Sequence, residues 1–432
     1  MCTILQSVQS DLATFGGWCF LAGVFLMVTG DGLTNYNEPD VASAWPWMYL
    51  VPLGVSFVLM AVAGRIDPRR PSRAAVVYAP LAALLGAFAL SAIFSQERAL
   101  SGQAFAGLIA ISVFWWYAGQ VLEDRRLAEA TWIIVALGVL VLAVRVIAWR
   151  LAEGLDQPAF QIRSVVWLGK LQITWVFNLI APFLVARFIS DPRRPSAIFN
   201  GITWAVVGVA NYLLLARMGL LVFILTTLAV CFANATYWRR WIWLMGAALA
   251  GGVLLIANNL RVTINVASGF FDRSRNPGID MRLGVWEEAW RMFLEHPIAG
   301  VGIGAFDELV YRIPDAGSNP FYRMNGWHAH NVPLHILAEA GVLGLTAWVF
   351  LWFVIVRQLV RARKNATREE RLIGSATLIA VAGFHVLSMT EVLIGARVHA
   401  GLQMNLTIAL VVVAGLRLSL PARAPAREVE PC

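Results

Sequence analysis

Charged residues are scarce in this chain of 432 residues. Asp, Glu, Lys and Arg together make up 14% of it, whereas a soluble domain carries roughly 25%. Apolar residues make up 59%, and they fall in blocks of about 17–25, the length that crosses about 30 Å of hydrocarbon as a helix. The composition therefore excludes a soluble globular protein. Runs such as 133–144, 220–230 and 341–356 show no period-two alternation, which favours helices over a β-barrel.

Several other features are missing. Cys2, Cys19, Cys231 and Cys432 lie at the termini or inside apolar runs, so we expect no structural disulfide in the long loop described below. The predicted spans have no Asp or Glu near their middle, which disfavours a proton-coupled transporter. The sequence also lacks a Walker motif, a Gly-x-Ser-x-Gly nucleophile elbow and, in its long loop, an Asp-rich metal cluster. Residues 1–9 lack a basic signal-peptide region, so we expect no cleaved leader.

The apolar blocks predict an all-α polytopic membrane protein with about twelve spans. They lie near 15–29, 46–63, 74–94, 104–121, 131–149, 165–187, 198–214, 218–235, 240–257, 334–356, 372–389 and 398–416. Arg and Lys gather after every second span, and the short loops between are poor in them. The positive-inside rule then places both termini in the cytoplasm. The net charge of +8 is thus explained by topology, and we expect no nucleic-acid partner.

This alternation also resolves the nearly continuous apolar stretch 198–233. An even number of crossings must fit between its flanking basic loops, so we expect the chain to turn back near residues 216–219. Arg217 would then lie at or slightly below the outer membrane surface. The predicted organisation is spans one to nine in 1–257, a periplasmic catalytic loop in 258–333, spans ten to twelve in 334–418, and a cytoplasmic tail in 419–432.

The long loop carries signs of order. Four apolar residues recur at helical spacing, with charged residues on the other side; the apolar ones are Leu283, Trp286, Trp290 and Phe293, and the charged ones are Glu287, Glu288 and Arg291. This predicts a helix that lies on the membrane or caps the bundle and ends at His296-Pro297. The glycines at 300, 302 and 304 predict a tight turn that docks the loop; no strand precedes them, so a dinucleotide site is disfavoured.

Polar residues surround the predicted start of the tenth span. Asn331 is a good N-cap and Pro333 suits a first helical turn. His330 would then sit at the positive end of the helix dipole, which favours the neutral imidazole that a general base needs. Asn331, His335 and Glu339 follow at spacings of four, a polar stripe expected to face the bundle interior or a water-filled cavity.

Two other interpretations of the histidines stay open. They could simply anchor a helix end at the membrane interface. Alternatively, His328 and His330 could bind a metal with His335 as a third ligand, although His335 is only a candidate for that role. We favour the general base and expect no metal.

Cations gather on the predicted outer face: Arg163, Lys170, Arg217, Arg282 and Arg397. The guanidinium fork matches phosphate oxygens, so several such cations would suit a diphosphate. Each alone could equally extend its head group to the membrane interface. We assign Arg145 and Arg150 to that second behaviour.

These motifs together resemble the O-antigen ligase/polymerase superfamily. The resemblance rests on Arg282 and Trp286 in a loop helix, a Pro-x-x-Gly-x-Gly-x-Gly-x-Phe turn at 297–306, the His330-Asn331 pair, and a Glu-x-Gly-x-x-Gly stretch at 339–344. It covers about 65 residues, and the twelve-span topology extends it along the chain. The family's loop His corresponds to His330, its loop-helix Arg to Arg282, and a further Arg to Arg217. At that third position the family's Ser-Arg-Gly setting is replaced by Ala-Arg-Met.

The resemblance implies a GT-C-like glycosyltransferase of the bacterial inner membrane, active at the periplasmic face without a cofactor or metal. It would ligate O-antigen from undecaprenyl pyrophosphate onto lipid A–core with inversion, using His330 as base. Arg217 and Arg282 would bind the pyrophosphate. The expected substrate-binding residues are Arg163, Lys170, His328, Asn331 and Arg397. An O-antigen polymerase or a protein O-oligosaccharyltransferase would share this chemistry, and a polyprenyl-linked glycan transporter is the alternative from another class.

Overall fold

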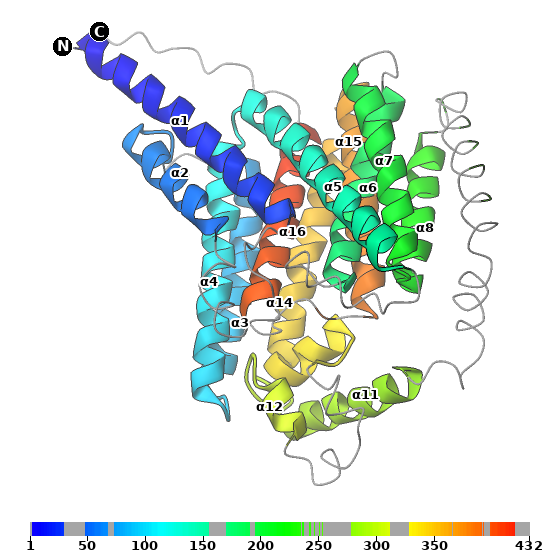
Figure 1. Cartoon of the computed structure of the whole chain (residues 1–432). Coiled ribbons are helices and arrows are strands. Elements are labelled where there is room, and N and C mark those ends of the chain that lie inside the picture. The colour runs from blue at the N-terminus through cyan, green and yellow to red at the C-terminus, as the bar shows by residue number, and fades with distance from the viewer. Residues whose placement is uncertain are drawn as a thin grey trace.

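The computed structural model describes residues 2–29, 48–67, 73–154, 170–190, 195–234, 278–311, 328–364, 366–390, 392 and 398–419, with isolated residues at 236, 242, 246, 250 and 253. The regular elements of these residues are helices (Figure 1). They are α1 (Cys2–Thr29), α2 (Leu50–Val62), the short η1 (Arg73–Val77), α3 (Tyr78–Ile93), α4 (Arg98–Val121), α5 (Arg125–Glu153), α6 (Lys170–Ser190), α7 (Pro195–Leu213), α8 (Arg217–Ala233), α11 (Gly278–Glu295), α12 (Phe306–Tyr311), α14 (Val332–Ala362), α15 (Arg368–Ser388) and α16 (Val398–Ser419).

Eight of the described helices are long and apolar enough to cross a membrane: α1, α3, α4, α5, α6, α7, α14 and α15. Shorter apolar helices occupy α2, α8 and residues 405–419 of α16. The chain is therefore an all-helical, multi-pass membrane protein. Eleven of the predicted spans overlap these helices, and of the predicted span at 240–257 only residues 242, 246, 250 and 253 are described. The count of twelve stays a prediction.

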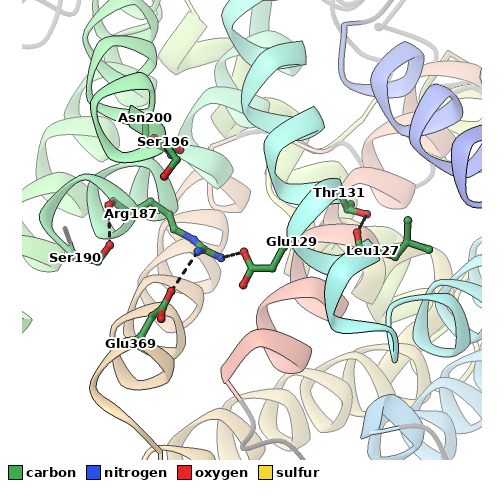
Figure 2. Close-up of polar contacts among 8 residues, drawn as sticks. All are labelled: Leu127, Glu129, Thr131, Arg187, Ser190, Ser196, Asn200 and Glu369. Carbon is green, nitrogen blue, oxygen red and sulfur yellow. Dashed lines mark hydrogen bonds and ion pairs between the residues drawn. The ribbon is translucent and has the colours of Figure 1, made fainter. Parts of the chain in front are cut away.

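Ion pairs and a backbone contact define one end of the bundle. Arg187, near the end of α6, contacts Glu129 of α5 at 2.6 Å and Glu369 of α15 at 3.4 Å (Figure 2). Arg417, near the end of α16, donates to the Glu123 carbonyl just after α4 at 2.9 Å. Gly374 of α15 lies against Arg363, the residue that follows α14. These positions coincide with basic clusters that the sequence predicts on one side of the membrane.

The opposite end gathers the other helix termini. Near the end of α5, Arg150 donates to the carbonyl of Leu213, the last residue of α7, at 2.8 Å. Gly219, in the first turn of α8, lies against Thr174 of the first turn of α6. The reversal between α7 and α8 falls at residues 214–216, directly before the predicted Ala216–Gly219, so the predicted turn is confirmed. Arg217 is the first residue of α8 at this end.

The central helix of the bundle is α6, which is the most buried of the candidate spans. Phe177, Ile180 and Leu184 of this helix are fully buried, and it packs against α7, α8 and α15. The interior is not purely apolar, because Asn178 in the middle of α6 is buried and donates to the Thr174 carbonyl at 2.8 Å.

The tenth predicted span, at 334–356, lies within the candidate span α14, but this helix is interrupted. Gly341 interrupts α14 with φ 63° and ψ −164°. Its break is filled by the loop segment 297–302 through four backbone hydrogen bonds: Val301 N–H to Ala338 O and Gly302 N–H to Glu339 O, both 3.0 Å, Val342 N–H to Pro297 O at 2.9 Å, and Leu343 N–H to Ile298 O at 3.3 Å. The loop thus satisfies the polar groups that the break exposes, as irregular backbone within a membrane bundle requires. Hydrophobicity alone could not reveal this interruption.

Candidate active site

The loop helix α11 runs across the end of the bundle below α14 (Figure 1). It ends at Glu295, so the predicted helix and its end before Pro297 are confirmed. The predicted apolar face is partly wrong. Val285, Ala289 and Met292 are the buried residues, whereas Leu283 and Trp290 are 47% and 49% exposed.

The reason for this rotation lies in what α11 packs against. Its buried residues share a small core with Phe306 and Val310 of α12 and with Ala329 and Ala338. Small side chains on α11 and α14 let the two helices approach closely, and Trp290 instead packs against Phe293 with ring centroids 5.1 Å apart. Leu283 and Trp290 of the helical repeat therefore point outward.

The charged residues of α11 divide into two groups. Arg291 pairs with Glu288 at 2.9 Å and with Glu295 at 2.7 Å, and the hydrogen bond that it donates to Glu288 raises the pKa of Arg291. Arg282 is different, because its Nε is buried and has no hydrogen-bond partner among the described residues. A buried, unsatisfied guanidinium nitrogen is costly unless a ligand completes it. Arg282 is therefore the cation of α11 with a buried nitrogen that the described contacts leave incomplete.

The glycine turn after α11 is confirmed as a docking element. Gly300, Gly302 and Gly304 have φ of 71°, 118° and 73°, a region that side-chain-bearing residues rarely adopt. A Cβ on Gly300 would overlap the backbone of Glu339, and one on Gly302 would overlap the Ser95 hydroxyl. The turn therefore lies against two transmembrane segments more closely than any larger residue allows.

Glu339 is a structural anchor for this turn. Its side chain is buried, and it accepts a hydrogen bond from the Phe306 amide at 3.2 Å and another from the Gly304 backbone. Its main-chain carbonyl also accepts the Ser91 hydroxyl at 2.6 Å. The predicted inward-facing stripe is thus confirmed for Glu339, whose carboxylate accepts hydrogen bonds from amides of the turn.

His335 lies one helical turn before Glu339 and is also buried. Its Nε2 is 3.4 Å from a Glu339 carboxylate oxygen, and the Phe306 ring packs edge-on against it at 5.0 Å. His328 and His330 lie close enough to interact with it electrostatically. Within the described part of the chain, however, no group of three or more His, Cys, Asp or Glu side chains is arranged to hold a metal ion.

The segment before α14 presents His330. Asn331 caps the helix by accepting the Leu334 amide at 3.0 Å, which confirms the predicted N-cap. His330 has φ 49° and is 9% exposed. Its amide donates to Nδ1 of His328 at 3.3 Å, and the two rings meet edge to face with centroids 4.2 Å apart. A left-handed residue other than glycine costs about 1–3 kcal/mol and is common at functional sites.

One hydrogen bond connects this segment to α11. The Trp286 indole N–H donates to the carbonyl of Ala329, the residue before His330, at 2.7 Å. Arg282 precedes Trp286 by four positions, so both side chains lie on the same face of α11. This bond ties the helix that carries Arg282 to the segment that carries His330.

The remaining predicted residues are placed less fully. Arg217 begins α8 at the same end of the bundle as the start of α14. Lys170 begins α6 at that end as well, and nothing is described of its side chain. Arg163 and Arg397 lie outside the described residues.

Arg150 is a residue that the sequence analysis misassigned. It was expected to extend to the membrane interface, yet it is only 2% exposed. Its Nε donates to the Leu213 carbonyl, one Nη donates to the Gly154 carbonyl at 3.4 Å, and its guanidinium lies 4.6 Å from the Trp149 ring centroid. The Trp-Arg pair at the end of a long apolar run was the available signal, but it could not show which carbonyls lie nearby.

Comparison with known families adds one finding. Residues 202–349 match the model of the family described as O-Antigen ligase. No curated protein matches the chain. The matched stretch contains Arg217, Arg282 and His330 together with the glycine turn, and it supports a glycosyltransferase-like ligase or polymerase function in broad terms.

Proposed function

Since this match assigns the chain to the O-antigen ligase superfamily, we propose that it is an O-antigen ligase. It transfers a polymerised glycan from undecaprenyl pyrophosphate to a sugar of lipid A–core. The observation that carries the proposal is the hydrogen bond between Trp286 and the Ala329 carbonyl, because it unites a histidine segment with an arginine helix. The start of α8, with Arg217, lies at the same end of the bundle.

In this mechanism the acceptor hydroxyl oxygen attacks the anomeric carbon of the donor from the side opposite the pyrophosphate. The anomeric carbon–oxygen bond breaks, its electron pair leaves on the pyrophosphate, and the configuration inverts. His330 takes the hydroxyl proton, a role that typically contributes roughly 10²–10⁴-fold. Arg217 and Arg282 stabilise the negative charge that develops on the leaving group. No metal is assigned a role.

Other residues would complete the substrate site. Arg163, Lys170 and Arg397 would add positive charge around the donor. His328 supports His330 through its Nδ1 contact and would face the acceptor sugar. The Asn331 side-chain oxygen caps α14, so its amide NH₂ would be the group left for a substrate hydroxyl.

We place the enzyme in the bacterial inner membrane, with both termini in the cytoplasm and the active site at the periplasmic face. This orientation is supported by charge. The basic residues Arg187, Arg363 and Arg417 lie at the end of the bundle opposite the starts of α8 and α14, and such residues favour the cytoplasmic side. The donor and the acceptor are both lipid-linked, so they reach the site within the same leaflet.

The test is a transfer assay with purified protein, undecaprenyl-pyrophosphate O-glycan and rough lipopolysaccharide, with EDTA present. We expect glycan on lipid A–core with wild type and a loss of roughly 100-fold or more in His330→Ala. His296→Ala is the matched control. This variant removes another loop histidine, whose Nε2 lies 2.9 Å from Nε2 of Gln96. It should retain activity.

The outcomes separate the alternatives. Longer glycans that stay on the polyprenyl carrier would identify a polymerase, glycan on protein would identify a protein O-oligosaccharyltransferase, and a translocated but unchanged donor would identify a transporter. Full transfer by His330→Ala would reject the base. Arg282→Lys should lose nearly as much activity as Arg282→Ala, because an ammonium cannot bridge two phosphate oxygens as the guanidinium does.

A further inference from the structure

Arg150 is the most deeply buried cation among the described residues. A charged side chain inside an apolar bundle is costly unless its donors are satisfied. Here the Nε donates to the Leu213 carbonyl at 2.8 Å and one Nη to the Gly154 carbonyl, while the second Nη is buried with no hydrogen bond to the described residues. The guanidinium therefore links the end of α5 to the end of α7 from inside the protein.

Its acceptor on α7 is a helix end. The last carbonyls of an α-helix have no partner within the helix, and they carry the negative end of the helix dipole. Leu213 is the last residue of α7, so a cationic donor at its carbonyl is favourable both as a hydrogen bond and as a charge. Arg150 thus adds a side-chain cap at Leu213, beyond the backbone bonds that Leu214 and Leu215 donate to the Ala210 and Tyr212 carbonyls.

The chain reverses directly after this cap, without a glycine. Leu215 takes φ 54°, which costs an L-residue about 1–2 kcal/mol. The turn therefore needs tertiary contacts to persist. Arg150 holds it on the α7 side, and Asn211 holds it on the α8 side by donating to the Gly219 carbonyl at 3.3 Å. Arg217 lies between these two fixed points.

We propose that Arg150 is a positioning residue for Arg217: by capping α7 it fixes the strained turn and so sets where the Arg217 side chain meets the donor pyrophosphate. The proposal rests on the proposed function. Only three residues, 214–216, lie between the capped carbonyl and Arg217. Loosening the cap would shift the start of α8, and a misplacement of about 1 Å at a catalytic group can cost on the order of 100-fold.

A double-mutant cycle tests this coupling. Arg150→Gln should lower kcat/KM for the polyprenyl-pyrophosphate donor by roughly 10- to 100-fold. In an Arg217→Ala background the same change should cost less than about threefold, because the group it positions is gone. Arg150→Lys should recover part of the loss, since an ammonium can still donate to the Leu213 carbonyl. Arg145→Gln, a change of another arginine in the same helix, is the control and should leave the rate within about twofold.

A second measurement does not depend on activity. Hydrogen exchange of the segment 213–220 should become faster in Arg150→Gln than in wild type or Arg145→Gln. An unchanged exchange rate in Arg150→Gln would show that Arg150 does not stabilise the end of α7 and would overturn the proposal. Faster exchange with full additivity in the cycle would show a purely structural residue and overturn the positioning role.

The two proposals fail in distinguishable ways. If wild type transfers no glycan, the ligase proposal fails, and the cycle is then measured on the dissociation constant for polyprenyl pyrophosphate. Coupling between Arg150 and Arg217 in that binding would keep the positioning role. Additivity, or no binding of the pyrophosphate at all, would reject it.

Discussion

Replacing Gly341 by alanine should open the break in α14. The residue has φ 63° and ψ −164°, and a Cβ there would overlap the Ile298 carbonyl. The backbone strain is about 1–3 kcal/mol. Displacing the adjacent Val342 and Leu343 hydrogen bonds to the loop, at 2.9 and 3.3 Å, adds about 1–3 kcal/mol. We therefore expect a loss of about 2–6 kcal/mol, concentrated where the glycine loop meets α14.

The measurement is unfolding of purified protein in detergent, followed by circular dichroism, together with the transfer rate. Gly86→Ala is the matched control, because a Cβ at that position in α3 meets nothing within 4 Å and alanine favours a helix over glycine by up to about 1 kcal/mol. A Gly341→Ala protein that unfolds at the same midpoint as Gly86→Ala would refute the geometry of the break.

Three further substitutions test separate contacts. Trp286→Phe removes the 2.7 Å hydrogen bond to the Ala329 carbonyl and should cost about 1 kcal/mol, which corresponds to a roughly fivefold lower transfer rate. An unchanged rate would show that this bond does not position the histidine segment for transfer. Asn331→Ala removes the cap of α14 and should lower stability by about 1 kcal/mol, with Asn331→Asp restoring most of it; equal loss in both would contradict capping. Arg187→Gln breaks the partly buried ion pairs at the far end of the bundle (Figure 2). It should cost about 1 kcal/mol of stability, less at high salt, and leave transfer normal. A large loss of activity would show that the two ends of the bundle are coupled.

Local patterns in the sequence predicted much of this architecture because they act through local physics. Apolar blocks of membrane length became helices, and the alternation of basic loops required a reversal inside 198–233, which the turn at 214–216 confirms. Asn331 acts as an N-cap since the side chain that accepts the helix amide lies only three residues away. The three glycines adopt positive φ, as expected of a tight docking turn.

Features that depend on distant parts of the chain could not be predicted. The face that α11 buries differs from the predicted face, because it is set by the close packing against Ala329 and Ala338. The apolar repeat within α11 does not encode these partners. The break at Gly341 requires the segment 297–302 to supply hydrogen bonds, so its helical and interrupted forms look alike in the sequence. Arg150 was misassigned for the same reason, since its partner Leu213 lies 63 positions away.

The site residues belong to two differently anchored parts of the molecule. His330 and Arg282 are held by the loop, through Trp286 and the glycine turn in the break of α14. Arg217 is held by the bundle, at the turn between α7 and α8. The described loop helices pack chiefly on α14. If Arg217 and Arg282 bind one pyrophosphate, as proposed, the donor itself bridges the two parts. Part of its binding energy would then be spent on assembling the site around the anomeric carbon, which raises specificity for the complete lipid-linked donor over a fragment that reaches one arginine alone.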